Sequence, residues 1–201
     1  STQRYQPVAT LSLALDYWQS GLKVNAFHRT AFGLYLVHLA LMFCLFRVLL
    51  SASFDERNAA AIALGATALY GFHGVNAETV NYLSARGVLL GSLFSVISLL
   101  IYARGGWSRK KRLYLIPLAL AVLSSRDAIA VAAIIFLHHL LYESEPGEPE
   151  VRRLKRALLA SLPSFMVAAF ALGLVVALSS EATRGTVSLD YLLTQPYVLA
   201  N

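Results

Sequence analysis

Two short polar stretches interrupt the apolar runs of this sequence, and their residue types could bind a phosphorylated sugar. The first, HGVNAETVNYLSARG at 73–87, contains Glu78, Tyr82, Ser84 and Arg86. A helix here would put Glu78, Tyr82 and Arg86, which are four residues apart, on one face. On that face Arg86 would hold a phosphate and Glu78 would accept hydrogen bonds from sugar hydroxyls. A helix-terminal salt bridge with caps at a wet interface explains the same residues, and spacing alone favours it.

The second polar stretch is Ser-Ser-Arg-Asp at 124–127, in the middle of an apolar segment. Ionisable groups at membrane depth are costly, and they are usually paired or functional. Helix capping explains Asp127, because either serine can cap a helix that begins there and an acid suits its first turn. Capping does not explain Arg126, which could be a second phosphate contact or a partner for Glu78. Both interpretations stay open on the sequence.

The histidines and the single cysteine give no sign of a metal or cofactor site. No spacing typical of metal ligands recurs among the five histidines, and His38 on an apolar segment is more commonly a packed residue than a haem or pigment ligand. The sequence has no glycine-rich phosphate loop, no CxxC pair and no nucleophile elbow. We therefore predict no metal and no cofactor.

Composition identifies the class of protein that must position these stretches. Hydrophobic residues make up 57% of the 201 residues, charged residues only 14%, and mean hydropathy is +0.60. An average soluble domain carries about 25% charged residues. These values exclude an ordinary soluble enzyme and a disordered chain, and they predict an integral membrane protein. The net charge of +6 comes from basic residues that flank apolar segments, so we expect no nucleic-acid partner.

The apolar runs predict an all-α fold, a polytopic transmembrane helical bundle. Spans are expected at about 30–50, 59–72, 88–103 and 157–178. Each half of segment 113–142 would be about 17–22 Å long as a helix, too short for a hydrocarbon core of about 30 Å. That segment is therefore predicted to be a short re-entrant-like helical hairpin with residues 124–127 at its tip. Interfacial helices are expected within 1–26 and 179–201.

The distribution of lysine and arginine predicts the orientation. Loops 51–58, 104–112 and 143–156, together with Arg47, hold most of the basic residues, and the other side holds far fewer. Because basic loops stay in the cytoplasm, loops 104–112 and 143–156 are expected to be cytoplasmic. Residues 73–87 and the hairpin tip then lie toward the extracytoplasmic side of a multi-pass protein.

Several stretches, in order along the chain, resemble one enzyme superfamily. They are YQPVATLSLALDYW with GLKVNAFH, LYGFHGVNAETVNYLSARGVLLGSLF, LALAVLSSRDAIAV and YLLTQPYVLA. The second resembles a motif in which His-Pro, Asn or His, Glu, Val-x-Tyr and Ser-x-Arg precede a leucine-rich span. The chain resembles the C-type (GT-C) membrane glycosyltransferase superfamily over nearly its whole length. The most similar group is the tetratricopeptide-repeat-bearing protein O-mannosyltransferases with their bacterial relatives.

The resemblance implies an enzyme that moves a sugar from a polyprenyl-phosphate donor to an extracytoplasmic acceptor. By matching position, Glu78, Tyr82, Ser84 and Arg86 would line the donor-side cavity. Arg126 and Asp127 stand where the family has Lys-Glu, and Arg126 would contact the lipid phosphate. The family's catalytic aspartate lies in a loop before the matched region, and its helical repeats follow that region. Residues 1–201 would then be a fragment, a single transmembrane domain whose catalytic residue is unknown.

A non-catalytic membrane subunit of a larger respiratory or photosynthetic complex is the alternative. Faces rich in small residues at 59–68 and 128–133 suit helix packing, although they suit the enzyme equally. The expected partners are membrane lipid and the polyprenyl-phosphate sugar donor, or other membrane subunits in the alternative. An aspartate-bearing loop upstream would favour the enzyme, and copurification with pigment or other subunits would favour the subunit.

Overall fold

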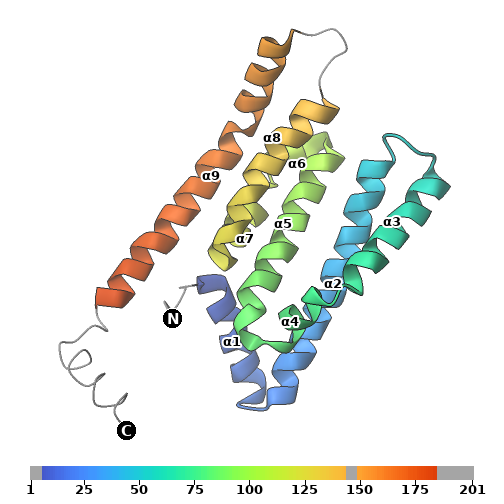
Figure 1. Ribbon diagram of the computed structural model, residues 1–201. Helices are drawn as coiled ribbons and strands as arrows, with labels where there is room; N and C mark the ends of the chain where they lie inside the picture. Colours follow the sequence, from blue (N-terminus) through green and yellow to red (C-terminus); the bar gives the residue numbers. More distant parts are fainter. Residues whose placement is uncertain (1–5, 144–148, 185–201) are drawn as a thin grey trace, which may run out of the picture.

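The computed structural model describes residues 6–143 and 149–184, apart from the side chains of Val75 and residues 179–184, and the described chain is helical with no strand (Figure 1). The predicted all-α class is confirmed. The α-helices are α1 Pro7–Ser20, α2 Val24–Leu50, α3 Glu56–Gly71, α4 Val75–Asn81, α5 Arg86–Arg104, α6 Gly106–Lys110, α7 Leu115–Ser124, α8 Ala130–Tyr142 and α9 Glu150–Arg184. Two 3-10 helices, η1 Leu83–Ala85 and η2 Arg126–Ile129, precede α5 and α8.

Helix boundaries follow from local backbone chemistry. Pro7 opens α1, where its missing N–H costs no helical hydrogen bond. Gly21 ends α1 and Gly105 ends α5, both with positive φ angles that a side chain disfavours. The Asp55 carboxylate caps α3 by accepting a hydrogen bond from the Asn58 backbone N–H.

Three helices are long and apolar enough to cross a membrane, namely α2, α5 with η1, and α9 up to Leu178. They contain the predicted spans at 30–50, 88–103 and 157–178, although α2 and α9 each begin several residues earlier than expected. The predicted span at 59–72 corresponds to α3, whose 16 residues give a helix of about 24 Å, shorter than a hydrocarbon core. Buried residues extend along α5 from Arg86 to Tyr102, so α5 is the central helix.

The segment after α6 forms the helical hairpin that its length predicts. Leu118 of α7 and Ile135 of α8 are buried in one cluster with Tyr102 near the end of α5. Near the tip, Ala128 and Ala132 pack with Ala121 of α7, and α9 covers this second cluster. Since α7 and α8 have only 10 and 13 residues, neither crosses a bilayer core alone.

A charged network joins α6 to the end of α8, at the end of the hairpin opposite its tip. Both guanidinium nitrogens of Arg109, in α6, donate to the Glu143 carboxylate at the end of α8. The Nδ1 atom of His139 lies 2.7 Å from the same carboxylate, and the Arg109 guanidinium lies 4.0 Å from the centre of the Tyr102 ring. The bidentate pair holds α6, the helix that precedes α7, beside the end of α8.

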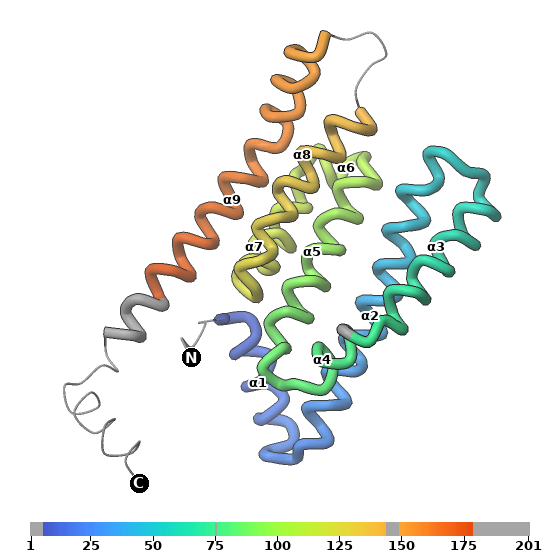
Figure 2. The backbone as a smooth tube through the Cα atoms, viewed as in Figure 1, coloured from blue at the N-terminus to red at the C-terminus, as the bar shows by residue number. Residues whose placement is uncertain are grey.

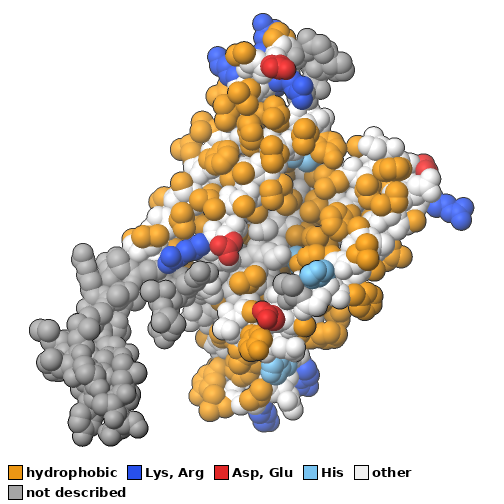
Figure 3. All heavy atoms as spheres, viewed as in Figure 1, with side chains coloured by type: hydrophobic (Ala, Val, Ile, Leu, Met, Phe, Trp, Pro, Cys, Tyr) orange, Lys and Arg blue, Asp and Glu red, His pale blue; other side chains and the backbone are white. Residues whose placement is uncertain are grey.

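The three basic loops lie at one end of the molecule. Figure 1 shows the α2–α3 turn, α6, the end of α8 and the start of α9 in the upper part of the view, while α1, α4 and the hairpin tip lie lower. Figure 3 shows hydrophobic side chains over much of the face between these ends. This arrangement groups the loops as the charge analysis expects, and the side of the membrane on which they lie stays a prediction.

Acidification is expected to weaken the Arg109–Glu143 network. Burial disfavours the Glu143 carboxylate, but the hydrogen bonds and charge of Arg109 outweigh burial and hold its pKa below the ordinary value of 4.5. A depressed pKa contributes stability above pH 4.5 that is lost as the pH falls through the lower, folded-state pKa. Glu143→Gln should therefore lower the melting temperature at pH 6. It should also reduce the further fall in melting temperature between pH 5 and pH 3. Glu150→Gln, an exposed change at the same end, should retain the wild-type pH profile.

Candidate functional site

The two polar stretches meet at the lower end of the bundle. Helix α5 contacts α1, α4, η1 and η2, so its first turns join the 73–87 stretch to the hairpin tip. Figure 2 shows the backbone of α1, α4 and the start of α5 crossing at this end. Segments that are separated by about forty residues in sequence therefore pack against the same helix, α5.

Glycines in the first turns of α5 permit this close contact. An added Cβ at Gly87 would lie 2.7 Å from the Ser124 carbonyl oxygen, and one at Gly91 would lie 2.7 Å from the Ser125 Cβ. Both distances are shorter than side-chain contacts allow, so the hairpin tip packs directly on the α5 backbone. The tip's position relative to the 73–87 stretch is consequently fixed by steric fit.

The 73–87 stretch does not form the single helix on which the shared face of Glu78, Tyr82 and Arg86 depended. Helix α4 ends at Asn81, and Tyr82 has extended dihedral angles of −97° and 121°. The chain then passes through η1 before α5 begins at Arg86. The periodicity argument fails here because a turn interrupts the four-residue repeat.

Arg86 is the most thoroughly buried of the predicted site residues. Its side chain is 1% exposed, and a guanidinium nitrogen lies 2.9 Å from a carboxylate oxygen of Asp16 in α1. The guanidinium also donates to the Phe27 carbonyl oxygen at 3.0 Å and to the Ser12 hydroxyl at 3.2 Å. These partners neutralise its charge inside the protein and connect α5 to α1 and to the start of α2.

Asp16 is a structural residue that sequence reasoning missed. The available signal is that Asp16 is the only acidic residue before position 55, and Arg86 is the only basic residue between positions 57 and 104. Isolated charges of opposite sign in apolar surroundings are expected to pair with each other.

The other predicted residues lie on the surface of this end. The Glu78, Tyr82, Ser84 and Asp127 side chains are exposed, and Arg126 is partly buried. The Glu78 carboxylate has no hydrogen-bond or ion-pair partner among the described residues, whereas the Asp127 carboxylate lies 3.5 Å from the Ser125 hydroxyl. This end of the bundle therefore carries two exposed carboxylates, an exposed phenol and the partly buried Arg126 guanidinium, which are groups that can bind hydroxyls and an anion.

Exposed apolar side chains adjoin these polar groups. Tyr82 is 62% exposed, Val88 47% and Ile129 39%, and Leu83 is also exposed. A lipid carrier needs an apolar surface next to the groups that contact its phosphate. This end of the bundle therefore carries polar groups and exposed apolar side chains together.

A second polar cluster lies inside the bundle and accounts for His38. Its Nε2 atom is 3.1 Å from the Tyr70 hydroxyl and 3.5 Å from the Ser92 hydroxyl, so α2, α3 and α5 meet there. The Tyr35 hydroxyl donates to the Gly71 carbonyl oxygen on the same side. His38 is packed and 1% exposed, and the described residues contain no cluster of three potential metal ligands.

No protein family, curated protein or solved structure matches this chain. The fold and the site define an all-helical chain with three helices long and apolar enough to span a membrane. Any assignment of a function to the chain therefore depends on its own residues and on the motif resemblance.

Proposed function

We propose that the chain is the membrane domain of a multi-pass glycosyltransferase that uses a polyprenyl-phosphate sugar donor. The observation that carries the proposal is the contact of the hairpin tip with Gly87, the last residue of the 73–87 stretch, and with Gly91 one turn later in α5. Glu78, Asp127 and Arg126, to which we assign sugar and phosphate binding, belong to the segments on the two sides of this contact, and exposed apolar residues adjoin them. The order of the motifs in the sequence supports the same function.

Within this proposal the predicted site residues take different roles. Arg126 contacts the lipid phosphate, and Glu78 and Asp127 accept hydrogen bonds from sugar hydroxyls. Arg86 is a positioning residue, because its guanidinium already binds Asp16 and is 1% exposed. Tyr82 and Ser84 line the donor surface, and the polyprenyl chain lies against the neighbouring apolar side chains.

The alternative, a non-catalytic packing subunit, has no specific observation in its favour. The small-residue faces that suggested it are used within the chain. Ala59 and Ala63 of α3 are fully buried, and Ala128 and Ala132 pack in the hairpin cluster with α9. Part of each face therefore packs within the chain, while Ala61 and Gly65 of the first face and Ala130 and Ala133 of the second are exposed.

Donor binding tests the proposal. The wild-type protein in phosphatidylcholine nanodiscs should bind a short-chain polyprenyl-phosphate sugar more tightly than the corresponding free polyprenol. Arg126→Gln should weaken binding by about tenfold or more, since a hydrogen bond to a charged group is worth about 1.5–3 kcal/mol. Isothermal titration of the nanodiscs measures both affinities.

Arg29→Gln is the matched control for this experiment. Arg29 is an exposed residue in the first turns of α2 at the same end, so its replacement removes the same charge from that surface. Its donor affinity should stay within about twofold of wild type, because exposed charges interact weakly through water. Equal losses in the two variants, or equal affinity of the wild type for donor and polyprenol, would contradict the proposal.

A further inference from the structure

A second binding site lies at the opposite end of the bundle from the proposed donor surface. A cavity of about 460 Å³ opens where α2, α3 and the end of α5 meet. Phe43, Val48 and Phe54 supply apolar walls, and the last turns of α2 and α5 supply Arg47 and Arg104. None of these residues belongs to the motifs discussed above.

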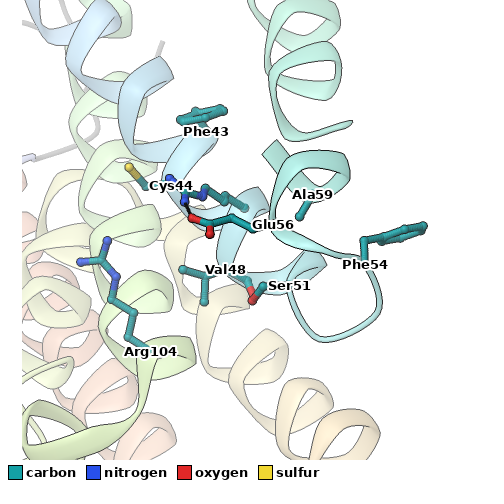
Figure 4. Close-up of a pocket in the computed structure, with 9 residues that line it drawn as sticks. Phe43, Cys44, Val48, Ser51, Phe54, Glu56, Ala59 and Arg104 are labelled. Atoms are coloured by element: carbon teal, nitrogen blue, oxygen red, sulfur yellow. Dashed lines mark hydrogen bonds and ion pairs between the residues drawn. The ribbon is translucent and has the colours of Figure 1, made fainter. Parts of the chain in front are cut away.

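The cavity carries an excess of positive charge. Arg47 forms an ion pair with Glu56, and Figure 4 shows Glu56 and Arg104 in the wall of the same cavity. No hydrogen bond or ion pair of the Arg104 side chain is found within the described part of the chain. Two arginines and one carboxylate therefore line the cavity, and an anion would balance the charge.

The Arg47–Glu56 pair is weak enough to be exchanged for an anion. The side chains are 46% and 82% exposed, and ion pairs this open to water contribute little. A phosphate accepts hydrogen bonds from guanidinium groups in the same bidentate geometry as a carboxylate and carries charge for a second arginine. Arg47 and Arg104 are thus able to bind one phosphate together.

We propose that this cavity binds an anionic phospholipid, with its phosphate on Arg47 and Arg104 and an acyl chain against Phe43 and Val48. Both arginines end long apolar helices, which is the depth at which lipid headgroups lie if these helices span a bilayer. A basic rim over an apolar wall between helices matches the two parts of a phospholipid. The inference is independent of the proposed donor site, because the residues and the end of the bundle differ.

Cys44 provides a direct reporter of occupancy. It is the only cysteine in the chain, it lines the cavity, and its side chain is partly accessible. The rate of alkylation by N-ethylmaleimide would be measured in nanodiscs of phosphatidylcholine with increasing phosphatidylglycerol. Bound phosphatidylglycerol should slow alkylation in a saturable manner, by about threefold or more at saturation.

Three variants separate the cavity from general surface charge. Arg104→Gln should weaken the apparent phosphatidylglycerol affinity by about fivefold, the effect of one basic contact near a membrane surface. Glu56→Gln should strengthen it, because Arg47 loses its competing partner; a folding defect does not produce a tighter site. Arg57→Gln removes an exposed arginine outside the cavity and should leave protection unchanged.

Other outcomes would overturn the inference. Absence of phosphatidylglycerol-dependent protection in the wild type would show that the cavity does not bind this lipid. Equal effects of Arg57→Gln and Arg104→Gln would assign the protection to bulk surface charge. Protection by soluble glycerol phosphate in pure phosphatidylcholine nanodiscs would identify a site for free phosphate esters, and the claim of a lipid would fail.

Discussion

Replacing Asp16 with asparagine is expected to destabilise the chain by about 3–5 kcal/mol and to release α1 from the start of α5. The Asp16 carboxylate is the ionic partner of Arg86, and the two side chains are 9% and 1% exposed. Removing one member of a buried pair leaves the other charge uncompensated in a poorly solvated environment, which costs this amount. The Ser12 hydroxyl and the Phe27 carbonyl retain their hydrogen bonds to Arg86, but neither carries a neutralising charge.

Thermal unfolding in detergent micelles measures this loss. With Trp107→Phe as background, Trp18 of α1 is the only tryptophan, and its fluorescence reports α1 directly. Asp55→Asn is the matched control, because asparagine caps a helix about as well as aspartate and α3 should be unaffected. Replacing the pair together, Asp16→Leu with Arg86→Met, should recover most of the stability. An Asp16→Asn variant within about 1 kcal/mol of wild type would mean that the pair does not hold α1.

The helices were predictable because apolar runs and helix-breaking residues are local signals. The runs located the three long helices, and the length argument predicted the hairpin at 113–142 from its central polar residues. The excess of lysine and arginine in loops 51–58, 104–112 and 143–156 predicts that these loops share one side. The errors at helix starts, as at Val24 in α2 and Glu150 in α9, arose because polar residues extend a helix beyond its apolar stretch.

The side-chain partners in the site were less predictable because they depend on tertiary contacts. Glu78 is much closer to Arg86 in sequence than Asp16 is, yet Asp16 forms the ion pair. Spacing puts Glu78 on the same helix face as Arg86, and the break in the helix at Tyr82 removes that geometry. The contact between Gly87 and Ser124 could not be predicted from the sequence either, because a glycine in a helix does not indicate which backbone segment packs against it.

Replacing Gly87 with leucine is expected to displace the hairpin tip and to destabilise the chain by about 2–3 kcal/mol. Overpacking a tight contact typically costs about 1–3 kcal/mol, and here the nearest rigid group is the Ser124 carbonyl oxygen, 2.7 Å from an added Cβ. Backbone has to move, because a carbonyl cannot rotate away as a side chain can. The displacement also separates Arg126 from the 73–87 stretch, so under the proposed function the variant should lose donor binding.

Gly33→Leu is the matched control, since an added Cβ at Gly33, within α2, meets nothing within 4 Å. Its unfolding temperature and donor affinity should equal those of the wild type. The Gln6 side chain also obstructs an added Cβ at Gly87, at 2.0 Å from its Oε1 atom, but Gln6 is free to rotate away. Adding Gln6→Ala to Gly87→Leu should therefore give little recovery. Full recovery in that double variant would mean that Gln6, and not contact with the hairpin tip, requires glycine at position 87.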